Sequence, residues 1–264
     1  MDEKNINQMI KLVDAYLKKR LAFTSSRARN LEQAMYYAVF PGGKRIRPLL
    51  VLSVAKILDI PFKKILPVAC GIELIHSFSL VHDDLPCMDN DDFRRGKPSC
   101  HKKFGEAEAL LAGDALLCLG IREIAKCGSP EAVIITCNAL GSNGMAGGQS
   151  LDMAYKNKKI PHKIKIWIDE KKTGELFRLC FEIPAIVGKA DKDVVGKLRQ
   201  TGALFGEAFQ ILDDIHDKEG NEKSLKKRLK KTYQQLLTQL ENFGSRADIL
   251  TSLIRMSFGS FVSD

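Results

Sequence analysis

Apolar residues recur along most of this chain with the 3.6-residue period of an amphipathic α-helix, and this pattern restricts the fold more than any other feature. Between residues 5 and 21, for example, Ile6, Met9, Val13 and Leu17 fall on one stripe. The alternation of Val, Ile and Thr that indicates half-buried strands is rare. We therefore expect an all-α fold, with further helices in these ranges: 29–40, 47–58, 64–84, 104–127, 131–157, 163–189, 192–217 and about 223–243, before a short apolar tail.

No linker and no internal repeat divides the 264 residues, so we expect a single domain over residues 1–264 whose helices pack around a central cavity. The longest apolar stretch, residues 48–55, is far too short to cross a membrane. The first residues are polar and lack the apolar core of a signal peptide. We expect a cytoplasmic protein without a membrane span, although a plastid or other transit peptide that had been removed would leave no trace here.

The seven cysteines are an odd number, lie in apolar sequence and form no Cys-x-x-Cys pair. This pattern indicates buried reduced thiols rather than disulfides or a zinc site. The formal net charge of +9 is compatible with nucleic-acid binding. However, the basic residues are dispersed, and the one dense run, residues 223–231, contains no aromatic residue. Small polyanionic substrates account for part of the positive charge equally well, so we expect no nucleic-acid partner.

Two clusters of aspartates stand where predicted apolar helices end. The first contains Asp83, Asp84 and Asp89, and the second contains Asp213, Asp214 and Asp217. Positions three, four and six or seven residues apart can share one face of a helix, so the carboxylates of a cluster can converge. Acidic runs are usually solvated surfaces, but the apolar residues before both clusters favour a functional role. Because Mg²⁺ prefers oxygen ligands and is often shared between carboxylates and substrate phosphates, the clusters predict a metal site that binds a diphosphate.

Cationic and amide side chains accompany both clusters. Arg94 and Arg95 carry planar guanidinium groups that match phosphate oxygens. Lys44, Arg45 and Arg47 lie at the start of a predicted helix, whose first backbone N–H groups favour an anion. Together with the aspartates, these cations predict one polar site inside a helical bundle. Four further polar residues are candidates for the same site: His76, Lys172, Thr173 and Gln210.

Four motifs occur in order along the chain. Residues 43–48 read Gly-Lys-Arg-Ile-Arg-Pro, residues 83–89 fit DDxxxxD, residues 94–96 read Arg-Arg-Gly, and residues 213–217 fit DDxxD. With these motifs the chain resembles the short-chain trans-polyprenyl diphosphate synthases of bacteria and plastids from about residue 31 to residue 217. The resemblance implies an isoprenoid-synthase type of helical bundle, and we expect a homodimer.

The resemblance also implies a reaction. Three Mg²⁺ ions, held by Asp83, Asp89 and Asp213 with help from the neighbouring Asp84 and Asp214, would bind the diphosphate of an allylic substrate and withdraw it, leaving a carbocation. The double bond of isopentenyl diphosphate would then attack this cation in a dry cavity. The family's contacts to the allylic diphosphate fall on Arg94, Lys172, Thr173 and Gln210, and its contacts to isopentenyl diphosphate fall on Lys44, Arg47, His76 and Arg95.

The chain departs from the family pattern after the second aspartate motif. The family usually continues with a GKxxGKD loop and then GKxTYP, but here the first element is missing and only Lys230, Thr232 and Tyr233 correspond to the second. We expect a shortened C-terminal region, and we keep Lys230 as a substrate-binding candidate. The missing loop favours an alternative function, a catalytically weak subunit that regulates a prenyl synthase. A terpene cyclase also uses DDxxD and Mg²⁺. Arg94, Arg95 and the Gly-Lys-Arg-Ile-Arg-Pro element at residues 43–48 disfavour it because they would serve a second diphosphate.

Phe78 lies five residues before Asp83 on the same predicted helix, where it would form the floor of the product channel. An ordinary core phenylalanine is the alternative. A bulky aromatic residue here, together with the four-residue spacing inside DDxxxxD, resembles bacterial farnesyl diphosphate synthases. We therefore expect farnesyl diphosphate (C15) as the product, with geranylgeranyl diphosphate (C20) as the alternative.

Overall fold

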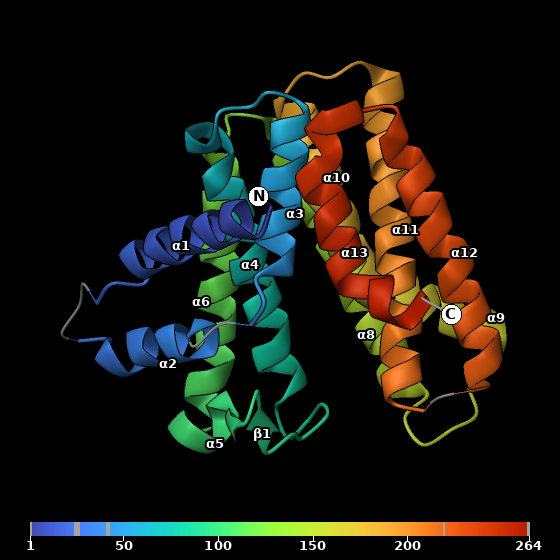
Figure 1. The fold of residues 1–264 in the computed structure, drawn as a ribbon. Coiled ribbons are helices and arrows are strands. Elements are labelled where there is room, and N and C mark those ends of the chain that lie inside the picture. The colour runs from blue at the N-terminus through green and yellow to red at the C-terminus, as the bar shows by residue number, and fades with distance from the viewer. Residues whose placement is uncertain (1, 24–26, 41–42, 219, 263–264) are drawn as a thin grey trace. The chain divides into compact units, whose positions relative to one another are not determined.

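The computed structural model describes residues 2–23, 27–40, 43–218 and 220–262. Within these ranges the chain is almost entirely helical, which confirms the all-α prediction (Figure 1). Two strands, β1 (Phe93–Arg94) and β2 (Lys97–Pro98), form a small antiparallel hairpin that the sequence pattern did not predict. The α-helices are α1 Asp2–Arg20, α2 Arg29–Val39, α3 Ile46–Ile57, α4 Phe62–Asp83, α5 Cys100–Phe104, α6 Glu106–Ala125, α7 Pro130–Leu140, α8 Met145–Ala154, α9 His162–Ile168, α10 Glu175–Val187, α11 Lys192–His216, α12 Glu222–Glu241 and α13 Asp248–Val262.

Several predicted helices are divided in the structure. The range 104–127 contains the end of α5 and all of α6, which separate at Gly105, where φ is +88° and favours glycine. The range 131–157 splits into α7 and α8. At the turn between them the backbone of Gly144 lies close to that of Ala139. A Cβ atom on Gly144 would be 2.1 Å from the carbonyl oxygen of Ala139, so this turn requires glycine. The range 163–189 contains a π-helical turn, η1 (Asp169–Gly174), between α9 and α10. The expected tail forms α13, which follows a 3₁₀ turn, η2 (Gly244–Ala247).

The chain divides into two compact units. One combines residues 1–6, 50–65 and 129–264. In it α11 packs against both α10 and α12, and α13 packs against α12 (Figure 1). Four phenylalanines are fully buried in this core: Phe177, Phe181, Phe205 and Phe258. The rings of the other three each contact that of Phe205 on α11. Large aromatic side chains of this kind contribute much of the hydrophobic stabilisation of a core, and here they join α11 to α10 and α13.

The other unit combines residues 7–49 and 66–128. Its helices α4 and α6 cross closely at Gly71 and Gly120, since neither residue has a side chain. A Cβ atom on Gly71 would lie 2.7 Å from the carbonyl oxygen of Gly120. Next to this crossing, the buried carboxylate of Glu123 accepts hydrogen bonds from Tyr16 at 2.5 Å and from Lys126 at 2.6 Å. Burial, and then this hydrogen bond, raise the pKa of Tyr16 to about 12. The expectation of one domain over residues 1–264 stays a prediction.

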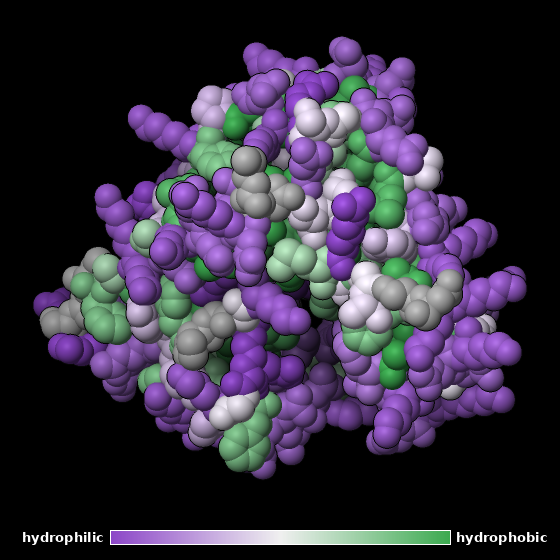
Figure 2. All heavy atoms as spheres, viewed as in Figure 1, coloured by the Kyte–Doolittle hydropathy of each residue, from purple (hydrophilic) through white to green (hydrophobic). Residues whose placement is uncertain are grey.

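Helix α4 is long and apolar enough to cross a membrane when judged by length and composition alone. However, 67% of its most apolar window is buried inside the fold. This burial is typical of a core helix, and the absence of a membrane span stays a prediction. Hydrophilic side chains cover most of the face seen in Figure 2, and hydrophobic groups appear there only in small patches.

Candidate active site

The first aspartate cluster surrounds the end of α4. Asp83 is the last residue of that helix, and the backbone N–H of Asp89 donates to its carbonyl oxygen at 2.9 Å. The N–H of Asn90 donates to the carbonyl of Leu85 at 3.1 Å, and Asn90 adopts a left-handed φ of +57°. This turn brings Asp83 and Asp89, both half-buried, to one end of the helix, as the spacing predicted.

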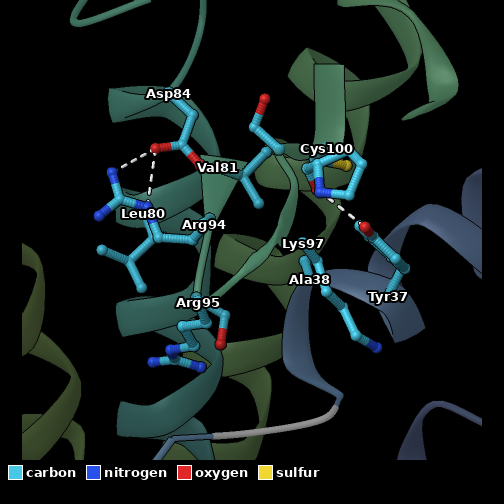
Figure 3. Close-up of a pocket in the computed structure, with 12 residues that line it drawn as sticks. Tyr37, Ala38, Leu80, Val81, Asp84, Arg94, Arg95, Lys97 and Cys100 are labelled. Atoms are coloured by element: carbon cyan, nitrogen blue, oxygen red, sulfur yellow. Dashed lines mark hydrogen bonds and ion pairs between the residues drawn. The ribbon is translucent and has the colours of Figure 1, made fainter. Parts of the chain in front are cut away.

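Asp84 has a different role from its neighbours. Its side chain is buried and accepts a hydrogen bond from Arg94 Nε at 2.9 Å (Figure 3). Arg94 also binds Asp91 at 2.9 Å. Burial raises the pKa of Asp84, although Arg94 opposes this effect. The hydrogen bond to Asp84 raises the pKa of Arg94. In this structure Arg94 therefore binds carboxylates, and Asp84 positions the arginine.

Arg94 and Arg95 owe their positions to the β1–β2 hairpin. Its two-residue turn consists of Arg95 and Gly96, with φ values of +53° and +74°. Positive φ at both positions is what a tight hairpin turn of this length requires. The hairpin borders a pocket of about 50 Å³ that Asp84, Arg94 and Arg95 help to line (Figure 3). This volume has room for only a few water molecules, so the pocket alone does not accommodate a prenyl diphosphate.

Arg47 and Arg95 form a cationic group around His76 on α4. Burial, followed by the charges of Arg47 and Arg95, lowers the pKa of His76 well below its usual value of 6.5. The imidazole is therefore neutral at physiological pH. The guanidinium of Arg95 lies over the backbone of Gly43, where a Cβ atom would be 3.1 Å from Arg95 Cζ. The structure thus brings together three of the four residues expected to bind isopentenyl diphosphate. The fourth, Lys44, is exposed before α3.

Arg45 corrects one interpretation of the sequence. We counted it among the cations of an anion site, but it is only 3% exposed. Its guanidinium forms ion pairs with Glu73 at 2.8 Å and Asp14 at 2.9 Å and lies 5.1 Å from the ring centre of Phe40. Arg45 therefore neutralises buried charge and stabilises the fold, which the spacing of its motif did not reveal.

The second aspartate cluster ends α11. Asp213 is half-buried and Asp214 is buried. Gln210 Nε2 donates to Asp214 Oδ1 at 3.3 Å, and Lys165 Nζ on α9 lies 3.3 Å from the same oxygen. The backbone N–H of Asp217 donates to the carbonyl of Asp213 at 2.9 Å and closes the helix. The helical spacing thus predicted the neighbourhood of Gln210 and Asp214, but not the contact with Lys165.

Lys172 and Thr173 stand in the π-turn η1, at the kink that the sequence indicated. Lys172 Nζ donates to Asp152 Oδ2 on α8 at 2.6 Å. The two elements approach closely, because a Cβ atom on Gly148 would lie 2.5 Å from the backbone nitrogen of Lys172. The amide of Gln149 is buried here, with no hydrogen-bond partner among the described residues. π-Turns often mark functional sites, and this one places Lys172 beside a buried polar group.

The last two candidates lie on helix faces. Lys230 is exposed on α12, while Thr232 and Tyr233 of the same sequence motif are buried. Phe78 is half-buried on α4, and its ring centre lies 4.8 Å from that of His82 in an edge-to-face arrangement. His82 in turn lies 3.0 Å from the carbonyl oxygen of Leu110. The role of Phe78 in chain length stays a prediction.

The aspartates fit a metal that a substrate helps to hold. Within the residues that the structure describes, no group of three His, Cys, Asp or Glu side chains is close enough to bind a metal ion alone. The donors at Asp83, Asp89 and Asp213 are carboxylate oxygens, the ligand type that Mg²⁺ prefers. Mg²⁺ is commonly bound by one or two carboxylates together with substrate phosphates, so the carboxylates of each cluster, taken by itself, fit Mg²⁺ bound with a diphosphate.

Comparisons with known proteins agree with these features. The family model described as polyprenyl synthetase matches residues 28–239. A farnesyl diphosphate synthase from Bacillus subtilis is 41% identical over 235 residues, which are 83% of this chain and 79% of that protein. The chloroplastic large subunit 1 of the heterodimeric geranylgeranyl pyrophosphate synthase from Arabidopsis thaliana is 37% identical over 75% of this chain and 56% of that protein.

Solved structures are similar over nearly the whole chain. An FPP/GFPP synthase from Zymomonas mobilis has a TM-score of 0.89 and 36% identity, with 97% of this chain and 98% of that one covered. A geranyltransferase from Legionella pneumophila has a TM-score of 0.91 and 34% identity, with 98% of both chains covered. The similarity therefore extends beyond the aspartate motifs to nearly the whole length of the chain.

Proposed function

The chain belongs to the polyprenyl synthetase family, and we propose that it condenses isopentenyl diphosphate with dimethylallyl or geranyl diphosphate to form farnesyl diphosphate. The observation that carries this proposal is the presence of two kinds of phosphate-binding group. Carboxylates for a metal-bound diphosphate end α4 and α11, whereas Arg47, His76 and Arg95 form a separate cationic group that needs no metal. Two such groups suit an enzyme with two diphosphate substrates and disfavour a terpene cyclase.

In this proposal Asp83, Asp89 and Asp213 hold Mg²⁺, with three ions expected when substrate is bound. Mg²⁺ supplies Lewis-acid stabilisation of the negative charge on the leaving diphosphate. Lys172, Thr173 and Gln210 donate hydrogen bonds to that diphosphate, as does Arg94 once it exchanges Asp84 for phosphate oxygens. Arg47 and Arg95 hold isopentenyl diphosphate through their forked donors, and neutral His76 adds an N–H donor without adding charge. Lys44 and Lys230 remain proposed contacts.

The relatives support a C15 product more strongly than a C20 product. Farnesyl diphosphate synthases of Bacillus subtilis and Geobacillus stearothermophilus are 41% and 40% identical to this chain. A geranylgeranyl pyrophosphate synthase from Catharanthus roseus is 40% identical, but over only 71% of the chain. We retain geranylgeranyl diphosphate as the second product candidate. We also propose that the enzyme is a cytoplasmic homodimer.

One structural observation favours a different function. Helix α11 ends at His216 and α12 begins at Glu222, so the connection is too short for the family's lysine-containing loop. A chain without this loop could serve as a catalytically weak subunit that regulates an active prenyl synthase. The retained aspartates and cations outweigh the missing loop, and we therefore place this function second.

One assay separates these functions. Purified protein is incubated with Mg²⁺, labelled isopentenyl diphosphate and, in turn, dimethylallyl, geranyl or farnesyl diphosphate, and products are resolved by chain length. We expect C15 product from dimethylallyl and geranyl diphosphates and little elongation of farnesyl diphosphate. Mainly C20 product would instead identify a geranylgeranyl diphosphate synthase. The absence of product from any primer, by a folded protein, would contradict the enzymatic proposal and favour the regulatory subunit.

A further inference from the structure

Lys165 connects two elements at the second aspartate cluster. Its Nζ lies 3.3 Å from Asp214 Oδ1 on α11 and 3.5 Å from Asp169 Oδ1 at the start of η1. The contact with Asp214 joins residues 49 positions apart, so it depends on the tertiary fold. The lysine side chain is 33% exposed, whereas that of Asp214 is only 12% exposed. A cation is therefore held next to a buried carboxylate and remains accessible to solvent.

Asp214 is fixed from two directions. Gln210 Nε2 donates to the same oxygen, Oδ1, that Lys165 contacts, also at 3.3 Å. Because both donors meet one oxygen, the orientation of the carboxylate is set by residues on two helices. Asp214 is next in sequence to Asp213, which the proposed function assigns to metal binding, so Lys165 adds a positive charge to the same cluster. Such a charge repels a bare divalent cation and attracts a polyanion.

The connection after α11 shows why this charge matters. The α11–α12 connection is short, and its described residues include one lysine, Lys218, which is exposed. Lys165, on α9 of the same unit, supplies a lysine that contacts the cluster in place of one from this connection. A lysine on a helix, held by two carboxylates, is restrained before a ligand arrives, which reduces the entropy lost on binding.

We propose that Lys165 is a diphosphate-binding residue, which Asp214 and Asp169 hold in place so that the cluster binds the magnesium–diphosphate complex in preference to Mg²⁺ alone. The inference rests on the proposed function, because it takes a diphosphate as the ligand of this cluster. It adds a residue that none of the sequence motifs contains. Lys165 acts through its charge, and Asp169 and Asp214 act by positioning it.

A variant without the charge of Lys165 should change its affinities for magnesium pyrophosphate and for Mg²⁺ alone in different ways. Lys165→Met keeps a side chain of similar length and removes the charge. Its affinity for the complex of Mg²⁺ and inorganic pyrophosphate should fall about tenfold, as expected for the loss of one charge-assisted contact. Its affinity for Mg²⁺ alone should stay the same or rise about twofold, because a repelling charge is gone. A residue that only supports the fold would weaken both affinities together.

Isothermal titration calorimetry on the full chain measures both affinities. Lys165→Arg retains the charge and should bind both ligands within about twofold of the wild type. Lys163→Met is the matched control, because Lys163 lies two residues earlier on α9 and is exposed. It should leave both affinities unchanged. Thermal unfolding of each variant tests whether the fold is retained.

The outcomes separate this inference from the proposed function. If wild-type protein does not bind magnesium pyrophosphate, the proposed function fails. If the wild type binds it and Lys165→Met binds equally well, only the role of Lys165 is wrong. A parallel loss of both affinities in Lys165→Met would also overturn the inference, since it would indicate a structural role.

Discussion

Lys172 is held by Asp152, whose Oδ2 lies 2.6 Å from the lysine Nζ, and this ion pair joins the π-turn η1 to α8. Both side chains are about one third exposed or less. The carboxylate therefore orients the ammonium that we assign to the allylic diphosphate. We expect Asp152→Asn to raise the KM for the allylic substrate about tenfold, with a smaller effect on kcat, because the lysine keeps its charge but loses its orientation.

Steady-state kinetics with each substrate varied separately would measure this effect. The KM for isopentenyl diphosphate should change little, which provides an internal control. An equal rise in both KM values would indicate that Asp152 supports the whole fold rather than Lys172.

The aspartates at the ends of α4 and α11 should dominate catalysis. Asp83→Ala or Asp213→Ala should lower kcat by about 10³-fold or more, because each change removes a proposed metal ligand that stabilises the leaving group. Asp59→Asn is the control, since the Asp59 side chain is highly exposed, lies 3.8 Å from Arg246, and its left-handed backbone suits asparagine. Near-wild-type turnover in either variant would show that the metals are held elsewhere.

Chain length should depend on Phe78. Its half-buried ring contacts His82 one turn later on α4, close to the aspartates that end the helix. Replacing this ring with Ala should open space and lengthen the product by one or more five-carbon units. Product analysis by chromatography measures this directly. An unchanged product distribution in an active Phe78→Ala enzyme would make Phe78 an ordinary core residue.

His76 should make the protein less stable in mild acid. Burial, and then the charges of Arg47 and Arg95, lower its pKa well below 6.5, so the unfolded chain binds this proton more readily than the folded chain. Stability should therefore fall as the pH drops below about 6.5. His76→Asn should remove about 1 kcal/mol of the difference in unfolding free energy between about pH 7.5 and about pH 5.5.

Denaturant unfolding at the two pH values tests this prediction. The exposed His162, changed to Asn, serves as the matched control and should leave the pH profile of the wild type in place. If His76→Asn shows the wild-type profile, other groups cause the loss of stability in acid.

Arg45 and Lys44 are adjacent in sequence, but we expect only Arg45 to contribute to the stability of the fold. Arg45→Ala should lower the free energy of unfolding by about 3 kcal/mol, because it leaves the buried carboxylate of Glu73 without its ion pair. Lys44→Ala should leave stability unchanged, since Lys44 is exposed. Chemical denaturation measures both. A stable Arg45→Ala protein with weakened substrate binding would restore the original interpretation of Arg45 as part of the anion site.

The sequence predicted the features that depend on local periodicity. The predicted range 192–217 ends within one residue of α11, and the aspartates fall at the helix ends as the apolar runs indicated. Grouping Arg47 and Arg95 around His76 followed from motifs rather than from periodicity. The features that were missed depend on tertiary contacts. The contact of Lys165 with Asp214 spans 49 residues, and the burial of Arg45 depends on Asp14 and Glu73, which a periodic pattern cannot specify.

The π-turn η1 has a consequence for how this chain tolerates insertions and deletions. A π-turn contains one residue more per turn than an α-helix, and each α-helical residue advances the helix by about 100°. Removing the extra residue from Asp169–Gly174 would therefore convert η1 to a regular turn and leave α9 and α10 in nearly their present rotation relative to each other. Lys165 would still face Asp214. The same deletion inside a regular helix such as α11 would rotate the residues on one side of it by about 100°, so η1 is where this chain should best accept the loss of one residue.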